Sequence, residues 1–163
     1  MNTVQVLALV ALVLLFGAAF WFGRRGAAAA VPVDPHDPLW IAAIERARAT
    51  VNDMRALQQS GHEVWVKFAL PTASAECEHF WGRIERLQDE ALVVAVETKP
   101  VSGGAVARQV TVQTGELEDW QVELADGSIR GGFTTRAQVT MARRDERHVP
   151  AHIAEMLGRM TDT

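Results

Sequence analysis

The chain begins with an apolar run, residues 4–22, in which Gln5 is the one strongly polar residue. At ~1.5 Å rise per residue, ~20 apolar residues cross the ~30 Å hydrocarbon core of a bilayer. The run predicts a transmembrane helix, and we interpret residues 1–25 as a membrane anchor. A cleaved secretory signal is the alternative, because Ala28 and Ala30 fit a small-x-small cleavage site, although no Lys or Arg precedes the run.

Two arginines, Arg24 and Arg25, follow the apolar run directly. Positively charged flanks stay on the cytoplasmic side of a membrane. The pair therefore predicts a single-pass anchor with a cytoplasmic C-terminal domain, with a periplasmic-facing or exported domain as the alternative. Residues 26–36 combine small residues with two prolines, which predicts a linker.

Helical periodicity begins after the linker. Asp37-Pro38 is a helix-start signal, because Asp caps free N–H groups and Pro loses no hydrogen bond at the first helical position. Apolar residues then recur at spacings of four and three, which predicts an amphipathic helix over residues 39–57. These residues are Trp40, Ile44, Ala47, Val51 and Met54.

The period then changes to two, which is typical of strands. Val64, Val66 and Phe68 alternate with Trp65 and Lys67, and Pro71 ends this strand. Further strands are predicted over residues 76–86, 90–98, 109–113 and 117–124.

The last part of the domain starts at a tight-turn signal, Asp126-Gly127. It predicts a hairpin into a long strand over residues 128–141, with Gly131-Gly132 as a bulge or a close backbone approach. Apolar residues at helical spacing predict a short C-terminal helix over residues 149–160.

These elements predict an α+β fold. We expect an N-terminal transmembrane helix, then an amphipathic helix packed on a curved five- to six-stranded antiparallel sheet or small barrel, and a short C-terminal helix. Residues 37–141 would form the domain, and residues 142–163 a helical C-terminal extension.

Composition and charge narrow the function classes. The 163 residues are 48% hydrophobic and 22% charged, which fits one globular domain plus a short extra element. Without Arg24 and Arg25 the chain carries 14 basic against 20 acidic residues, a balance of -6, and this argues against nucleic-acid binding. The single Cys77 excludes an internal disulfide.

Glu78, His79 and Asp119 are the best candidates for chemistry, because a His side chain titrates near neutral pH and carboxylates can orient it. Adjacent strand residues point to opposite faces, however. A structural role is therefore favoured, with His79 packed beside Trp81 and Glu78 paired with an arginine. His148 and His152 are four residues apart, but no third ligand follows, and we predict no metal site.

Aromatic residues beside glycines can line a groove that a ligand approaches closely, although a core role is the alternative. The candidate ligand-binding residues are Glu78, His79, Trp81, Asp119, Trp120, Gly131, Gly132, Phe133 and Arg136. The sequence lacks a Gly-rich phosphate loop, a G-x-S-x-G elbow, an HExxH and a CxxC motif. We therefore predict no catalytic residue and no cofactor.

The order of several short motifs resembles the bacterial YegJ-like domain of unknown function. The motifs are Asp37-Pro38, Val66-Lys67-Phe68, Glu78-His79-Phe80-Trp81, Asp119-Trp120, Asp126-Gly127 and Gly131-Gly132-Phe133-Thr134-Thr135-Arg136. The resemblance covers residues 37–136 and implies a small envelope-associated or cytoplasmic domain, without a reaction. Thr98 departs from the family pattern, which has Asn at this point before Pro100.

Anchor and resemblance together lead to an expectation for function. We expect a single-pass protein of the bacterial inner membrane whose domain is a binding or interaction module for an unknown protein or small-molecule ligand. The alternative is a small hydrolase or metal-dependent enzyme that uses His79 with Asp119 or Glu78.

Overall fold

A computed structural model describes residues 33–72, 75–101 and 103–161. The anchor predicted at residues 1–25 and the linker as far as residue 32 lie outside this range. Among the described residues, no helix is both long enough and apolar enough to cross a bilayer. The predicted fold class included a transmembrane helix, and that part of the prediction is corrected.

The predicted amphipathic helix is confirmed, with a break at Thr50. It forms α2 (Pro38–Ala49) and α3 (Val51–Gln59). The Asp37 carboxylate caps α2 by accepting a hydrogen bond from the Leu39 N–H at 2.9 Å. Pro38 occupies the first turn, where a missing N–H costs no helical hydrogen bond.

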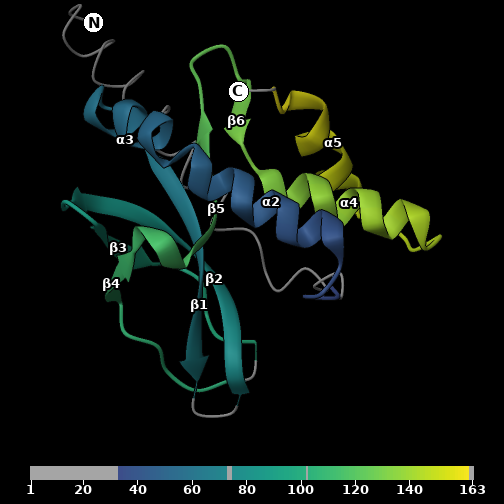
Figure 1. The fold of residues 1–163 in the computed structure, drawn as a ribbon, viewed down its shortest axis with the longest axis horizontal. Helices are drawn as coiled ribbons and strands as arrows, with labels where there is room; N and C mark the ends of the chain where they lie inside the picture. Colours follow the sequence, from purple (N-terminus) through teal and green to yellow (C-terminus); the bar gives the residue numbers. More distant parts are fainter. Residues whose placement is uncertain (1–32, 73–74, 102, 162–163) are drawn as a thin grey trace, which may run out of the picture. The chain divides into compact units, whose positions relative to one another are not determined.

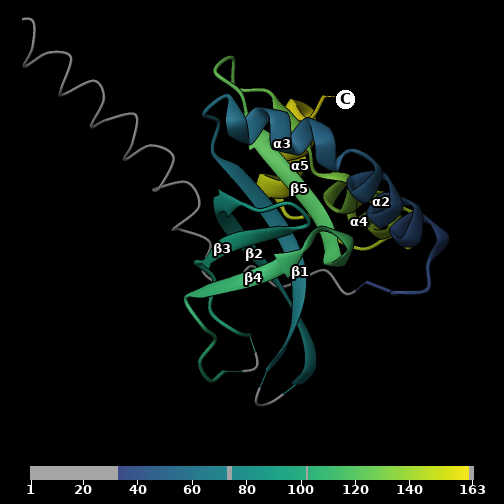
Figure 2. The same ribbon diagram turned by 60° about the vertical axis from the view of Figure 1, so that its left-hand side comes forward.

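The sheet has six antiparallel strands in the order β4-β3-β2-β1-β5-β6. The strands are β1 (Val64–Thr72), β2 (Ala75–Leu87), β3 (Ala91–Val96), β4 (Gln109–Gln113), β5 (Leu117–Glu123) and β6 (Ile129–Gly131). A single 3-10 turn, η1 (Thr114–Glu116), joins β4 to β5, although three strands separate them in the sheet. The sheet must therefore curve strongly, and β3 and β4 run steeply across β1 and β5 (Figure 2).

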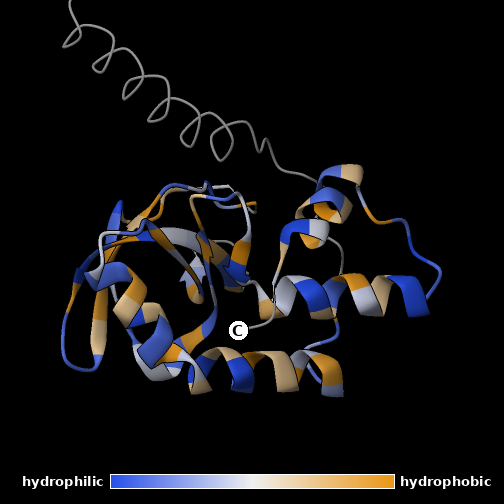
Figure 3. Ribbon diagram, turned by 90° about the horizontal axis from the view of Figure 1, so that it is seen from above, coloured by the Kyte–Doolittle hydropathy of each residue, from blue (hydrophilic) through white to orange (hydrophobic). Residues whose placement is uncertain are grey.

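Two helices cover β5 and are packed side by side, α2 and α4 (Phe133–Arg144), while α5 (Ala151–Arg159) packs on α4 (Figure 1). Apolar and polar residues alternate along these helices, as amphipathic packing requires (Figure 3). The core between helices and sheet is built mainly from apolar side chains, among them the buried Met54, Val66, Phe68, Phe80 and Trp120.

The predicted last strand over residues 128–141 is wrong, and so is the small barrel. β6 has three residues and is followed by α4, so β4 and β6 are the two edges of an open sheet. Gly131 and Gly132, with φ of 82° and 71°, turn the chain out of the strand. Beyond them Phe133, Ala137 and Met141 are buried at a spacing of four, which is helical. The predicted C-terminal helix is confirmed as α5.

The turn at Gly131 leaves no room for a side chain. A Cβ atom there would lie 2.1 Å from the Trp120 carbonyl oxygen, and the φ of 82° disfavours any L side chain. We expect Gly131→Ala to lower the free energy of unfolding by about 3 kcal/mol, measured by urea denaturation. Gly158→Ala is the matched control, because an added Cβ in α5 meets nothing within 4 Å. Equal urea midpoints for the two variants would contradict this account.

Candidate functional site

Asp119 is fully buried and holds the start of α4 against the sheet. Its Oδ1 accepts hydrogen bonds from the N–H groups of Trp120 at 2.8 Å and Phe133 at 3.0 Å. Its Oδ2 accepts from the N–H of Thr134 at 2.8 Å and from the Thr134 hydroxyl at 2.6 Å. The N-cap position itself is Gly132, which has no side chain to offer. Asp119 therefore caps α4 from the neighbouring strand, and a negative charge there complements the helix dipole.

The capping carboxylate is also strongly desolvated. Burial raises the pKa of Asp119 above its ordinary value of 3.8, and the hydrogen bonds from Thr134 oppose this shift. The nearby Lys67 ammonium also acts to lower the pKa. Asp119 is thus a structural group without an accessible face.

The strand that carries Asp119 contains a bulge just before it. Lys67 of β1 pairs with Asp119, but Phe68 pairs with Leu117, so Glu118 is the extra residue. An extra residue bends a strand and changes the direction of its side chain. The Glu118 side chain consequently reaches across β1 to strand β2, where its Oε2 lies 2.7 Å from His79 Nδ1.

The pair formed by His79 and Glu118 has one buried and one accessible member. The Glu118 side chain is 11% exposed and the His79 side chain 49%. An ionised carboxylate only accepts hydrogen bonds, so Nδ1 is the donor and Nε2 is the nitrogen left for another contact. The buried carboxylate therefore fixes the orientation of a half-exposed imidazole.

Lys67 supplies positive charge beside these carboxylates. Its Nζ lies 4.3 Å from the centroid of the Trp40 ring, which is a cation–π distance. Burial lowers the pKa of Lys67, while the charges of Glu118 and Asp119 act to raise it. The ammonium therefore balances part of the negative charge carried by the bulge.

Cys77, His79 and Trp81 alternate along β2 and so lie on one face of the sheet. Burial raises the pKa of the Cys77 thiol, and the charge of Glu118 raises it further. The thiol therefore stays protonated, which makes it a poor nucleophile. Among the residues that the structure describes, no three His, Cys, Asp or Glu side chains are placed to share a metal ion. We use the name His79 face for Lys67, Cys77, His79, Trp81 and Glu118.

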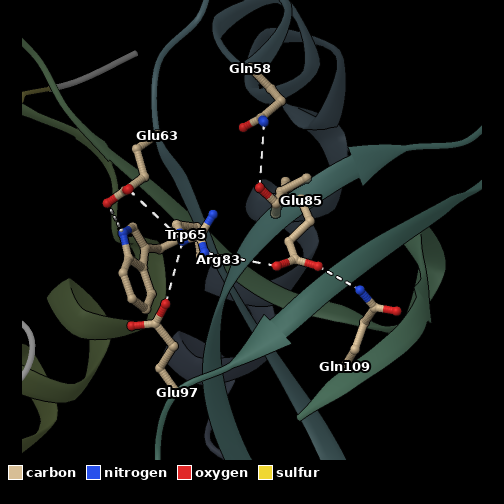
Figure 4. A network of polar contacts seen from close by, with 8 residues as sticks. Gln58, Glu63, Trp65, Arg83, Glu85, Glu97 and Gln109 are labelled. Carbon is tan, nitrogen blue, oxygen red and sulfur yellow. Dashed lines mark hydrogen bonds and ion pairs between the residues drawn. The ribbon is translucent and has the colours of Figure 1, made fainter. Parts of the chain in front are cut away.

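The same row of β2 continues into a charged cluster (Figure 4). Arg83 lies 3.9 Å from Glu63, 3.8 Å from Glu85 and 3.4 Å from Glu97, between their nearest nitrogen and oxygen atoms. The Trp65 indole N–H donates to Glu63 at 3.0 Å. Exposed ion pairs of this kind contribute little stability. Their consequence is an acidic boundary at one end of the His79 face.

Glu78 points away from His79, as strand alternation predicts. Its two carboxylate oxygens accept hydrogen bonds from the Thr72 hydroxyl at 3.1 Å and from the Val101 N–H at 2.7 Å. These contacts join the end of β1 to the loop that follows β3. Glu78 therefore does not contribute to the His79 face.

Trp120 and Phe133 are core residues. Trp120 is fully buried and its indole N–H donates to the Thr50 hydroxyl at 3.0 Å, at the break between α2 and α3. The Phe133 ring stands edge-on to Trp120, with 5.8 Å between centroids. Both side chains fix the helices to β5 and line no groove among the described residues.

Gly131, Gly132 and Arg136 belong to the same junction. The Arg136 guanidinium donates to the Gly131 carbonyl at 2.8 Å and to the Thr161 carbonyl at 2.7 Å. A Cβ added at Gly132 would lie 2.5 Å from the end of the Met160 side chain. These residues therefore hold the C-terminal segment against the turn between β6 and α4.

The structure thus divides the candidate residues. It brings His79 and Trp81 together on an exposed face, and it places Asp119, Trp120, Gly131, Gly132, Phe133 and Arg136 in or beside the β5–α4 junction. Sequence reasoning missed Glu118 and Lys67, whose roles depend on the bulge. Glu118 stands next to Asp119 in the sequence, but nothing local indicates which of the two acids meets the imidazole.

Fold and site together define an α+β domain with an open antiparallel sheet, in which a strand carboxylate caps a helix. The chain belongs to the bacterial family described as "Uncharacterized protein conserved in bacteria (DUF2314)", whose model matches residues 39–152. No curated protein and no solved structure matches the chain. The expectation of a bacterial domain of unknown function is confirmed, and the YegJ-like name stays a prediction.

Removal of the Asp119 carboxylate tests whether this side chain caps α4. Asp119→Ala leaves the N–H groups of Phe133 and Thr134 buried without an acceptor. We expect a loss of about 3 kcal/mol in the free energy of unfolding, measured by urea denaturation. The control is Asp126→Ala, because Asp126 makes a similar N–H contact to Ser128 in an exposed turn. A loss no larger than that of the control would mean that Asp119 is not the cap.

The raised pKa of Asp119 predicts a pH dependence. An acid whose pKa is raised in the folded state holds its proton more tightly there, so its ionisation above pH 3.8 costs folded-state stability. The stability of wild type minus that of Asp119→Asn should therefore decrease as pH rises from about 4 to about 7, measured by urea denaturation. Asp37, Asp126 and Asp145 have lowered pKa values and lose stability toward acid, but they are common to both proteins. A difference that increases with pH would contradict the shift.

Proposed function

We propose that the chain is a protein-binding module and that the His79 face carries its binding site. The observation that supports this proposal is the pair of Glu118 and His79, in which a buried carboxylate orients a half-exposed imidazole. Burial of a carboxylate is costly unless hydrogen bonds compensate for it. Unlike Asp119, Glu118 forms its hydrogen bond with a group at the surface. The buried carboxylate therefore orients an accessible side chain, that of His79.

The chemistry of the face suits a polypeptide segment. Cys77, His79 and Trp81 form a row in which neighbours are separated by about 7 Å, twice the rise per strand residue. Alternate side chains of an extended segment have the same spacing. Ala69 pairs with His79 and is exposed and small, so a partner can approach the imidazole from β1. Trp81 offers aromatic surface of the type enriched at protein interfaces.

The geometry favours binding over the hydrolase alternative. The predicted pair of His79 and Asp119 would need the Asp119 carboxylate, which caps α4. Glu78 points to the opposite face, and the Cys77 thiol has a raised pKa. These arrangements leave the oriented imidazole without a neighbouring activated nucleophile among the described residues.

Site-specific photocross-linking in the bacterial host tests the proposal. The full chain carries a photoreactive benzoylphenylalanine in place of Ala69, beside His79. We expect one covalent protein adduct, detected by blotting and identified by mass spectrometry. Trp81→Ala or His79→Ala in the same chain should reduce its yield by about tenfold, because each removes a central contact.

Two controls make the experiment specific. Ala154 is an exposed alanine of α5 and should give no such adduct when it carries the same photoreactive group. His152→Ala removes an exposed histidine of α5 and should leave the yield unchanged. Absence of an adduct at Ala69, or an adduct that survives both Trp81→Ala and His79→Ala, would contradict the proposal.

A further inference from the structure

The two edge strands of the sheet, β6 and β4, differ in length and in what lies beside them. At one edge, β6 has three residues, and the C-terminal segment lies along it. Met160 bridges Ile129, and the Thr161 N–H donates to the Ile129 carbonyl at 2.9 Å. At the other edge, β4 pairs with β3 and has no second strand partner in the described part of the chain. Of these two described edge strands, β4 therefore offers the longer open edge.

The outward groups of β4 follow from its hydrogen bonds to β3. The Val96 N–H donates to the Arg108 carbonyl, and the Thr114 N–H donates to the Glu90 carbonyl, both at 2.9 Å. Arg108 and Thr114 thus face β3, and so do the residues at even positions between them. Gln109, Thr111 and Gln113 point their backbone groups toward the open edge, and all three are exposed.

Devices that protect an edge strand are absent from β4. Edge strands in soluble proteins usually contain a lysine, a proline or a bulge that prevents pairing with another chain. β4 has the sequence Gln-Val-Thr-Val-Gln, which is uncharged and rich in β-branched residues, and its register with β3 is regular throughout. Such a strand favours pairing with another strand.

The sequence of β4 is the same in both directions about Thr111. We propose that β4 pairs antiparallel with β4 of a second copy of this chain, with Thr111 on the twofold axis. Each Thr111 then faces Thr111 of the other copy, Val110 faces Val112, and Gln109 faces Gln113. The contact is isologous, as a closed twofold dimer requires. It continues each sheet into the other.

Charge favours this register. Arg108 and Glu116 are exposed and lie just beyond opposite ends of β4. Antiparallel pairing about Thr111 brings the Arg108 end of one copy to the Glu116 end of the other, at both ends of the contact. No like charges face each other, which would be destabilising. In the described chain the Gln113 N–H donates to Glu116 at 3.1 Å. In the dimer it donates to the Gln109 carbonyl of the other copy instead, which frees the Glu116 carboxylate to meet Arg108.

The burial of Val110 and Val112 also favours the β4–β4 contact. Val112 is buried on the core face of β4, whereas Val110 on that face is only partly covered. In the dimer Val112 of the second copy lies opposite Val110 and adds apolar cover to it. The proposal is independent of the His79 face, which lies on other strands.

Disulfide trapping tests the register. In the full chain with Cys77→Ser, Thr111→Cys should form a cross-linked dimer under mild oxidation. Cα atoms of a hydrogen-bonded antiparallel pair lie about 5.5 Å apart, within disulfide range. Gln109→Cys is the matched control on the same edge, because two copies of Gln109 would be about 13 Å apart. Gln109→Cys should cross-link only when mixed with Gln113→Cys.

Co-purification of two differently tagged full chains tests the contact without a disulfide. Thr111→Lys places two like charges on the axis and should reduce co-purification by about tenfold. Thr140→Lys, at an exposed position of α4, should leave it unchanged. Circular dichroism and a urea midpoint establish that each variant is folded. Failure of Thr111→Cys to cross-link, equal cross-linking of Gln109→Cys alone, or co-purification unaffected by Thr111→Lys would overturn the proposal.

Discussion

The carboxylate of Asp119 on β5 caps the start of α4, and the helical layer depends on that contact. Asp119 satisfies N–H groups that a helix beginning at Phe133 leaves without acceptors. The contact requires the chain to leave β6 abruptly, which Gly131 and Gly132 permit with their positive φ angles. Once α4 is fixed in this way, α2 can pack against both α4 and β5, and α5 can pack on α4.

The same constraint sets the position of the candidate site. Leu117 packs beside Phe68 in the core, while Asp119 must meet α4, and both demands are met only if the strand between them bulges. Glu118 is the residue that the bulge displaces, and its carboxylate reaches His79. Lys67 lies opposite and compensates part of the buried charge. The oriented imidazole is thus a consequence of the register that the helix cap imposes.

Local signals in the sequence predicted most of the elements. The cap at Asp37-Pro38, the alternation from Val64 to Phe68 and the turn at Asp126-Gly127 each act within a few residues, and the structure has a helix, a strand and a hairpin there. The helix α4 was missed because its cap comes from Asp119, fourteen residues before Phe133. Thr134, Thr135 and Val139 of α4 are buried as well. These β-branched residues obscure the helical spacing in the sequence and resemble a strand pattern. For the site, alternation placed His79 beside Trp81, but the bulge at Glu118 is a property of strand pairing that no local pattern contains.

The motifs at Asp119-Trp120 and Gly131–Phe133 belong to the family resemblance seen in the sequence, and they meet at one buried joint. Every polar group of Asp119 is occupied there, and the two glycines are needed for turn geometry and close packing. A joint of this kind specifies a fold and leaves no group for a ligand. The binding site that we propose therefore uses side chains that the joint orients without enclosing them. Among the described residues the imidazole of His79 fits that description best, because its partner Glu118 is buried and the ring itself is half exposed.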